Sequence, residues 1–377
     1  MGNDKILPYL RQHEGEFFEM LREFVELESP SHENKEASDR CSRFLEEAFG
    51  GLGFDIERIR QDACGDHIYG ELGGGEGSAV VLGHYDTVFP IGTIQTMPFK
   101  TENGKAYGPG ILDMKGGIVM AYFAVKALRD LGLTPNRRIG IFFNGDEESG
   151  SFSSSDLILR KSRNYNCALV MEPGINDLNS VKTRRYGRGT YEIVAHGRSA
   201  HSGSNSHLAA SPLTELAHQL LYIERWNNDT EGATLSPTLI GGGIANTCMI
   251  PETAYFSMDV RFKTEELGSA IHERVMNLQA LTPNVRLEVR GKIDKPVMIG
   301  DAALYQKAAE AGRQYGLELK GVTVGGGSDG NFTAAAGIPT LDGLGTTGEF
   351  LHNPREYIHI EHVPYRTAML AKLLQTL

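Results

Sequence analysis

Two hydrophobic patterns alternate along the first half of the chain. One has apolar residues at intervals of three and four, as on one face of a helix, and the other is a short continuous apolar run. The helical patterns cover residues 14–29, 35–53, 115–133 and 153–162, and the apolar runs cover residues 79–88, 138–148 and 167–173. Continuous apolar strands that alternate with helices indicate a mainly parallel sheet covered by helices on both faces. This part of the sequence therefore predicts an α/β domain.

The pattern changes near residue 180. Between residues 181 and 290, the order strand, helix, strand, strand, helix, strand predicts an α+β unit of the ferredoxin-like kind. The helix and strand alternation resumes after residue 290 and ends in a helical pattern at the C-terminus. We predict an α/β domain of residues 1–180 and 291–377, interrupted by an inserted α+β domain of residues 181–290.

Composition limits the partners of the chain. Its 377 residues exceed the ~250–300 at which a single core stops growing, which agrees with two domains. A net charge of -11 argues against nucleic acid and against an anionic membrane surface, because both attract basic patches. No apolar run approaches the ~18 residues of a membrane span, and the N-terminal residues lack the apolar stretch of a signal peptide. These features predict a cytoplasmic protein.

The four cysteines are Cys41, Cys64, Cys167 and Cys248, and no two form a CxxC pair. Wide spacing does not suit a disulfide framework or a thiolate zinc site. We therefore expect buried, reduced thiols.

Acidic and histidine side chains follow the predicted strands. His84 and Asp86 end the first apolar run, residues 146–148 (Asp-Glu-Glu) end the second, and Glu172 ends the third, while Asp113 lies where a loop opens a helix. The carboxyl ends of parallel strands meet at one edge of a sheet, where such sheets bind ligands. Each residue alone also fits a helix cap, a solvated turn or a core histidine. Five such groups at successive strand ends favour a metal site.

The separation of these residues along the sequence predicts different roles for their side chains. Residues two apart in a strand face the same side, so the Asp86 carboxylate can accept a hydrogen bond from the His84 ring and fix its orientation. Adjacent residues diverge, so Glu147 and Glu148 should not bind the same ion. One can bind a metal while the other acts as general base on a water whose pKa the metal lowers to ~7.

Eight short motifs follow one another along the chain. In order, they are GHYDTV, AYGPGILDMKGG, NGDEESGS, MEP, GRSAHSG, ANTCMIPETAYFSMDVRF, GGGSDGN and LHNPREYI. In these motifs the chain resembles the zinc-dependent metallopeptidases of family M20, and most nearly the glutamate carboxypeptidases of the carboxypeptidase G type. The resemblance covers nearly the whole chain.

The resemblance implies two zinc ions, with cobalt or manganese as alternatives. His84, Asp113 and Glu172 would bind one ion, and Asp113, Glu148 and His352 would bind the other, with Asp113 as the bridge. Glu147 would be the general base, and Asp86 would support His84. Two divalent ions ~3.5–4 Å apart repel by roughly 17–19 kcal/mol at an effective dielectric of 20. Carboxylates must therefore lie among them.

A second set of roles falls on the inserted domain and the glycine-rich loop. The resemblance implies that His201 stabilises the oxyanion of the tetrahedral intermediate. It assigns contacts with the substrate carboxylate to Arg261 and Asn246. The glycines of VGGGSDGN would let backbone N–H groups approach an anion closely, so we also expect Gly326, Gly327 and Ser328 to bind the substrate. From the residues alone, a surface salt bridge, a loop histidine and a flexible turn remain open for Arg261, His201 and the glycines.

The basic run KTRRYGR at residues 182–188 is not typical of the family. A solvated or domain-junction role and a contact with an acidic substrate both remain open for this run.

The implied function is a dizinc exopeptidase or amidohydrolase that cleaves an amide next to a free carboxylate, as a carboxypeptidase that releases a C-terminal amino acid such as glutamate. An N-acyl-amino-acid deacylase of the acetylornithine or succinyl-diaminopimelate type would share every metal ligand. A non-catalytic metal-binding scaffold has no reason to keep Glu147. We expect a small peptide or N-acyl amino acid as substrate and a homodimer formed through the inserted domain, in which we hypothesise that His201 acts on the partner's site.

Overall fold

The computed structural model describes residues 4–31, 33–243 and 247–377. The chain divides into two compact units. The larger unit comprises Met1–Arg184, Met298–Val324 and Ser328–Leu377, and the smaller unit comprises Arg185–Val297 and Gly325–Gly327.

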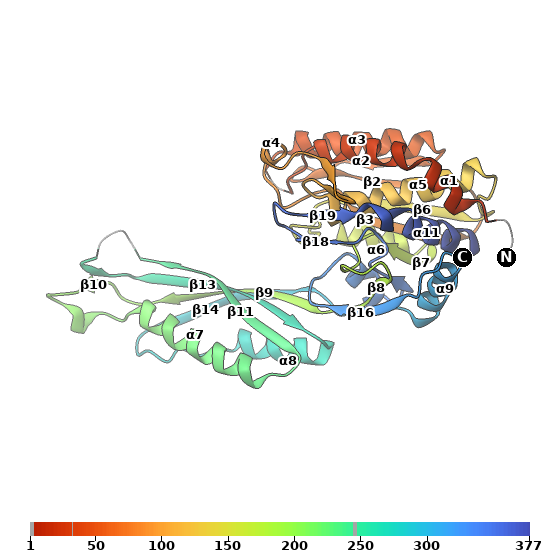
Figure 1. The fold of residues 1–377 in the computed structure, drawn as a ribbon. Helices are drawn as coiled ribbons and strands as arrows, with labels where there is room; N and C mark the ends of the chain where they lie inside the picture. The colour runs from red at the N-terminus through yellow and green to blue at the C-terminus, as the bar shows by residue number, and fades with distance from the viewer. Residues whose placement is uncertain (1–3, 32, 244–246) are drawn as a thin grey trace. The chain divides into compact units, whose positions relative to one another are not determined.

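The larger unit is built on a six-stranded sheet with the order β1-β2-β6-β3-β7-β17 (Figure 1). Its strands are β1 (Asp55–Ile59), β2 (Gly65–Leu72), β3 (Gly77–His84), β6 (Arg138–Gly145), β7 (Tyr165–Val170) and β17 (Thr340–Leu341). The strands β6, β3, β7 and β17 are parallel, whereas β2 is antiparallel to both β6 and β1. The prediction of a mainly parallel sheet is confirmed.

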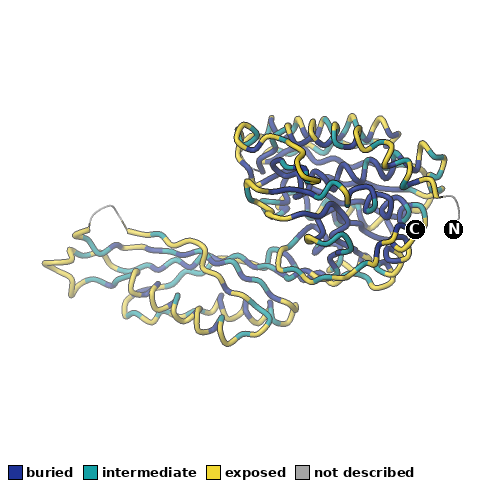
Figure 2. The backbone as a smooth tube through the Cα atoms, in the orientation of Figure 1, coloured by how far each residue is buried: buried dark blue, intermediate teal, exposed yellow. Residues whose placement is uncertain are grey.

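Helices cover both faces of this sheet, because successive side chains of each strand point to opposite sides. Val81 of β3 packs in the core cluster beneath α2, α3, α5 and α11, while Val80 and Leu82 pack on the other side with Ile158 of α6. Figure 2 shows the strands buried between more exposed helices. The helices of the larger unit are α1 (Ile6–Gln12), α2 (Glu14–Glu26), α3 (Lys35–Gly51), α4 (Thr93–Thr96), α5 (Gly116–Asp130), α6 (Ser155–Ser162), α9 (Ala302–Arg313), α10 (Gly330–Ala335) and α11 (Val363–Thr376).

Two small sheets complete the larger unit. One has the order β15-β8-β16 and the other the order β18-β19-β5-β4. Their strands are β4 (Lys100–Glu102), β5 (Lys105–Tyr107), β8 (Ser180–Arg185), β15 (Met298–Ile299), β16 (Lys320–Val324), β18 (Gly348–Glu349) and β19 (Tyr357–His359). The second sheet matters for the site, because the loop between β18 and β19 carries His352.

The smaller unit has the predicted strand and helix order. Its main elements are β9 (Gly187–His196), α7 (Pro212–Asp229), β11 (Ala233–Gly242), β13 (Thr253–Phe262), α8 (Glu265–Met276) and β14 (Arg286–Lys295), with a short pair of β10 (Ala200–His201) and β12 (Met249–Ile250). The antiparallel sheet has the order β11-β13-β9-β14. Ile223 of α7 and Val275 of α8 share one core cluster with Ile193 and Phe256, so both helices cover the same face. The other face carries the alternating polar residues of the strands.

Capping residues explain where several helices begin. The side chains of Asn34, Ser211 and Thr264 accept backbone N–H groups at the first turns of α3, α7 and α8. Such side-chain oxygens satisfy donors that have no partner inside the helix. None of the helices in the described ranges combines the length and the apolar character that crossing a bilayer demands.

All four cysteines are free thiols. Cys41, Cys64 and Cys167 are buried as predicted, but Cys248 is exposed, so the prediction of burial was wrong there. Cys248 directly precedes β12, a strand that pairs with β10 outside the main sheet of the smaller unit and away from its core.

Candidate metal centre

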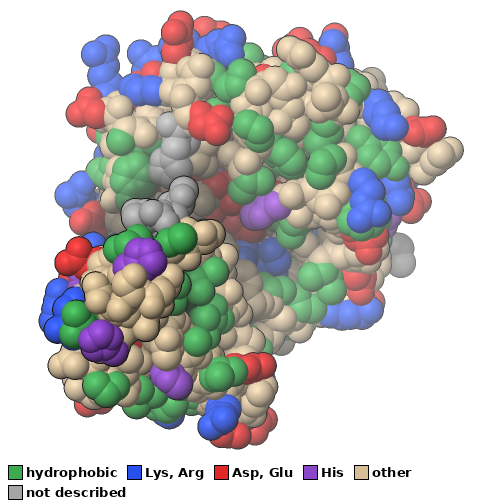
Figure 3. Space-filling model, turned by 90° about the vertical axis from the view of Figure 1, so that its left-hand side faces the viewer, with side chains coloured by type: hydrophobic (Ala, Val, Ile, Leu, Met, Phe, Trp, Pro, Cys, Tyr) green, Lys and Arg blue, Asp and Glu red, His purple; other side chains and the backbone are tan. Residues whose placement is uncertain are grey.

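Three neighbouring parallel strands deliver side chains to one edge of the main sheet. Strand β3 ends at His84, β6 ends directly before residues 146–148, and β7 ends two residues before Glu172. These strands lie side by side in the order β6-β3-β7, so their carboxyl ends coincide. Figure 3 shows acidic side chains recessed beside a histidine on one face of the molecule.

Asp113 lies between two histidines. Its Oδ1 atom is 3.2 Å from His84 Nε2, and its Oδ2 atom is 3.1 Å from His352 Nε2. Asp113 belongs to the turn Ile111–Lys115 that opens α5, and it is buried. One carboxylate therefore presents an oxygen to each of two imidazole rings, which is the arrangement that a bridge between two ions requires.

Two glutamates complete the pair of ligand sets. Glu172 Oε1 lies 3.6 Å from His84 Nε2, and Glu148 Oε1 lies 3.0 Å from His352 Nε2. Ligand atoms around a tetrahedral ion with bonds of 2.0–2.2 Å are about 3.3–3.6 Å apart. The observed separations are close to these values, so the residues present fit two ions that share Asp113.

The carboxylates at this edge of the sheet create an electrostatic potential that favours positively charged groups. Hydrogen bonds to Asp113 and Glu148 raise the pKa of His352 to about 11. Burial, reinforced by the charge of Asp113, raises the pKa of Glu148 to about 8. His352 also has φ 59°, a left-handed backbone conformation that is uncommon outside glycine and clusters at functional sites.

Asp86 holds the His84 ring and the turn after β6 in place through hydrogen bonds. His84 Nδ1 lies 3.0 Å from the main-chain oxygen of Asp86 and 3.3 Å from its Oδ1, so the ring turns Nε2 toward Asp113. The same carboxylate accepts the N–H groups of Glu147 (3.2 Å) and Glu148 (3.0 Å) and the hydroxyl of Ser31 (2.6 Å). One buried side chain thus ties the end of β3 to the turn after β6.

Geometry alone does not separate the roles of the two adjacent glutamates. Ligand atoms of His84, Glu147 and Glu172 lie within 4.8 Å of one another, and those of His84, Asp113 and Glu148 do so as well. Both glutamates are therefore within reach of an ion, and the choice of base rests on chemistry.

Glu356 is a supporting residue that sequence reasoning did not single out. It is fully buried, and its Oε1 atom accepts the N–H groups of Leu112 (2.7 Å) and Asp113 (3.1 Å). Burial, with the charge of Asp113 as the next cause, raises the pKa of Glu356 to about 8. The only signal in the sequence is its place four residues after His352, which does not reveal a contact 243 residues away.

Lys182 is a second supporting residue that sequence reasoning missed. Its Nζ atom lies 3.7 Å from Glu172 Oε2, and both side chains are buried. In the sequence, Lys182 is simply the first member of the basic run at residues 182–188, whereas the structure places it beside a candidate ligand.

A third cluster of ligand-type residues lies next to the acidic turn. Cys64, His67 and Asp146 are all buried, and their ligand atoms lie within 4.8 Å of one another. The hydroxyl of Ser153 sits among them, 2.8 Å from Asp146 Oδ2, 3.0 Å from His67 Nε2 and 3.3 Å from Cys64 Sγ. Burial raises the pKa of Cys64 to about 11, which keeps the thiol neutral. This cluster is therefore a hydrogen-bonded support for the turn that carries Glu147.

His201 lies in the smaller unit and is exposed. Its Nδ1 atom accepts the N–H groups of Gly203 (3.1 Å) and Ser204 (3.2 Å). A neutral ring that accepts at Nδ1 carries its proton on Nε2. His201 thus presents an N–H donor.

Arg261 and the glycine segment also meet in the smaller unit. Arg261 donates from Nε to Asp259 (2.7 Å) and from Nη1 to the carbonyl of Gly325 (3.1 Å). Arg185 donates to the carbonyls of Gly326 and Gly327, each at 3.0 Å. Ser328 belongs to the larger unit, is buried and donates its hydroxyl to Asp342 at 2.5 Å. Asn246 lies outside the described residues.

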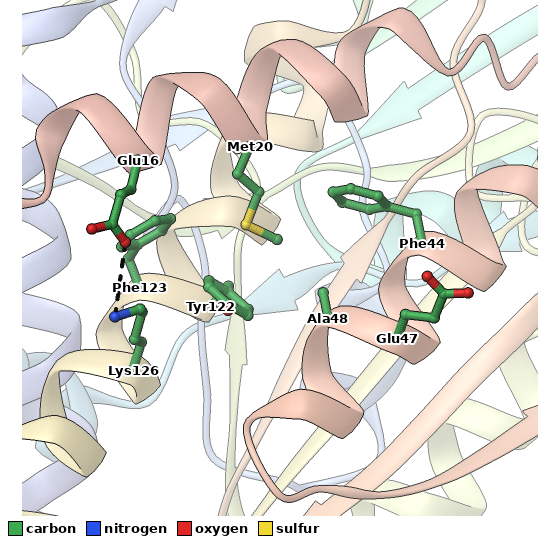
Figure 4. A pocket seen from close by; sticks show the side chains of 8 residues that line it. All are labelled: Glu16, Met20, Phe44, Glu47, Ala48, Tyr122, Phe123 and Lys126. Carbon is green, nitrogen blue, oxygen red and sulfur yellow. Dashed lines mark ion pairs between the residues drawn. The ribbon is translucent and has the colours of Figure 1, made fainter.

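A cavity of ≈ 410 Å³ on the helical face of the larger unit has a different character (Figure 4). Helices α2, α3 and α5 line it with a mixture of apolar and charged side chains, including an ion pair of 3.9 Å between Glu16 and Lys126. None of the candidate metal ligands lines this cavity.

The chain is similar to several known proteins. A model of peptidase family M20/M25/M40 matches residues 80–376. Carboxypeptidase G2 of Pseudomonas sp. (strain RS-16) is 30% identical over 351 residues, 89% of this chain and 83% of that protein. Succinyl-diaminopimelate desuccinylase of Methylorubrum populi is 28% identical, over 88% of this chain and 92% of that protein. The fold is similar to that of the YXEP protein of Bacillus subtilis, described as a dinuclear metal binding peptidase, with TM-score 0.70 and 14% identity over 97% of this chain and 98% of that chain.

We predict that the acceptor oxygen of Glu356 supports metal binding by fixing the Asp113 backbone. Glu356→Gln keeps an acceptor, whereas Glu356→Leu leaves two buried N–H groups unpaired at ~1–3 kcal/mol each. Metal affinity, measured by competition with a chelator, should fall about 10–100-fold in Glu356→Leu and only a few-fold in Glu356→Gln. The exposed Glu361 offers a matched control as Glu361→Gln. A folded Glu356→Leu protein with unchanged metal affinity would remove this supporting role.

Proposed function

The chain belongs to peptidase family M20/M25/M40, and from this premise we propose that it hydrolyses an amide bond next to a free carboxylate with two bound metal ions. The family resemblance predicted from the motifs is confirmed, as is the prediction of a hydrolase. The alternative of a non-catalytic scaffold is therefore not retained.

The position of Asp113 between His84 and His352 carries this proposal. In our assignment, His84, Asp113 and Glu172 hold one ion, and Asp113, Glu148 and His352 hold the other. We propose zinc, with cobalt or manganese as alternatives, because imidazole and carboxylate ligands suit all three. The description of the YXEP protein as dinuclear supports a pair of ions.

The bound ions would polarise the substrate carbonyl and make a water acidic enough to attack at neutral pH. Glu147 would accept the proton of that water and return it to the leaving amine, as general acids and bases do. His201 would donate its Nε2–H group to the oxyanion, because its Nδ1 atom is already an acceptor. Asp86 would hold His84 and the backbone of Glu147 in place throughout.

We infer that the substrate is a small peptide or an N-acyl amino acid whose free carboxylate binds the planar fork of Arg261. Asn246, the backbone of Gly326 and Gly327, and Ser328 would complete this contact. Similarity to carboxypeptidase G2 favours release of a C-terminal amino acid such as glutamate. Similarity to the desuccinylase supports the second candidate, a deacylase of the acetylornithine or succinyl-diaminopimelate type. Turnover of a peptide with C-terminal glutamate, compared with turnover of N-acetylornithine and N-succinyl-diaminopimelate, distinguishes the two.

We also propose that the larger unit is the catalytic domain and that the smaller unit serves as lid and dimerisation domain. Strand β11 is an edge of its sheet, and it exposes 55% of Leu239 and 59% of Ile240. Exposed apolar edge strands favour pairing with another chain. A two-fold dimer through this edge, with His201 acting on the partner's site, is the form that we favour.

Glu147 and Glu148 give a matched pair for testing the chemistry. Glu147→Gln should keep both ions and lower kcat for an N-acyl amino acid by ~10²–10⁴, the range for loss of a general base. Glu148→Gln should lose metal first, because it removes a ligand charge. Metal content and kcat, measured on the same preparations, show which glutamate is the general base and which is the metal ligand. Nearly full activity in Glu147→Gln would move the base elsewhere.

Subunit mixing tests the dimer and the trans role of His201 together. In a mixed dimer of Glu147→Gln and His201→Ala chains, one site carries both defects and the other combines two intact residues. Random exchange makes about half of the dimers mixed, so roughly a quarter of wild-type activity should return. If exchange is confirmed and activity stays at the level of the parents, His201 acts within its own chain.

A further inference from the structure

Arg188, from the basic run whose role the sequence left open, lies directly beside Arg261. In the antiparallel pair of β9 and β13, Arg188 and Arg261 are direct partners. Directly opposite residues project from the same face of a sheet, and like charges in that position destabilise it. The two side chains are 31% and 26% exposed, on the face that α7 and α8 do not cover. This arrangement of two like charges needs a compensating partner or a ligand.

Asp259 supplies part of the compensation and aligns both arginines. It precedes Arg261 by two residues on β13, so its side chain lies on the same face. Its Oδ1 atom accepts Nε of Arg261 at 2.7 Å, and its Oδ2 atom accepts Nε of Arg188 at 2.8 Å and Nη2 of Arg261 at 3.2 Å. Within the described ranges, the terminal Nη groups of Arg188 have no hydrogen-bond partner. Asp259 therefore fixes the guanidinium of Arg188 and leaves its outer edge available.

A row of balanced, solvated ion pairs does not explain the cluster of Arg188, Arg261 and Asp259. Farther along the same strands, charges balance. Arg290 lies within ion-pair distance of Glu192 and Glu288, and Glu288 is also within 3.9 Å of Arg286. That region has two acids for two arginines. At the other end Asp259 pairs with two arginines, and the next acid, Asp294, accepts the Thr190 hydroxyl and lies 4.0 Å from Lys292, so this cluster carries a positive charge in excess.

We propose that Arg188 and Arg261 together bind the two carboxylates of an acidic amino acid at the released end of the substrate. This inference rests on the proposed function, which gives the first carboxylate to Arg261, and it adds Arg188 as the residue that selects a second one. Both Nε atoms bond to the same carboxylate, so they lie no more than about 8 Å apart. The two carboxylates of one aspartate or glutamate can bridge that span. Each guanidinium has N–H groups beyond those that bond to Asp259 and to the Gly325 carbonyl, and these can donate to one carboxylate each.

A pair of near-isosteric substrates isolates the second carboxylate. N-benzoyl-L-glutamate and N-benzoyl-L-glutamine differ by one carboxylate against one amide. We expect the metal-loaded wild type to prefer the glutamate substrate by about 10–100-fold in kcat/KM, the value of a hydrogen bond to a charged group. In Arg188→Gln this ratio should fall toward one, mainly through a higher KM for the glutamate substrate. The exposed Arg290 provides the matched control, because Arg290→Gln removes a charge from the same face outside the cluster.

Binding measurements separate this inference from the proposed function. Calorimetry measures the affinities for L-glutamate and L-glutamine without turnover. It therefore tests binding by the arginine pair even if the protein hydrolyses neither benzoylated substrate. The inference is supported if the wild type binds L-glutamate more tightly than L-glutamine and Arg188→Gln removes this preference. An unchanged ratio of glutamate to glutamine in Arg188→Gln would overturn it. If Arg188→Gln does not fold, Arg188→Lys keeps the charge without the fork and should lower the same ratio by a smaller factor.

Discussion

The site depends on crowding carboxylates into one buried place. Asp113, Glu148 and Glu172 lie around two histidines, and their side chains are only 11%, 9% and 7% exposed. Buried like charges repel, and each also loses its hydration. Hydrogen bonds to Asp113 and Glu148 raise the pKa of His352, whereas burial first and the charge of Asp113 second raise the pKa of Glu148. Divalent cations relieve the repulsion, which is why the arrangement indicates a metal centre rather than a solvated acidic surface.

The rest of the larger unit holds these groups at fixed positions. Parallel strands bring His84, the acidic turn and Glu172 to one edge. Asp86 then orients the His84 ring and fixes the backbone of the acidic turn, and Glu356 fixes the backbone of Asp113. Each supporting carboxylate accepts two N–H groups, so the ligand-bearing turns cannot rotate without breaking both bonds. Preorganisation of this kind keeps ligand atoms within a few tenths of an ångström of the separations that an ion demands.

Part of the site could be predicted from sequence for physical reasons. Strand ends follow from apolar periodicity, and parallel strands must align their carboxyl ends, so the sequence alone groups His84, the acidic turn of residues 146–148 and Glu172. The family motifs then added His352, which no local pattern connects to the strands.

Contacts that depend on distant segments could not be predicted. Glu356 meets Asp113 from 243 residues away, and Asp259 and Arg188 meet across 71 residues. The exposure of Cys248 could not be predicted either, because composition does not say which strand pairs outside a core.

Titration of ion-free protein with zinc tests the central claim, that Asp113 joins two metal sites into one centre. Calorimetry with elemental analysis of the gel-filtered product should give two ions per chain in the wild type. Asp113→Asn, which keeps the shape of the side chain but halves its capacity to bridge, should weaken both binding steps together. A wild type that retains a single ion, or an Asp113→Asn protein that binds two ions as tightly as the wild type, would contradict the account.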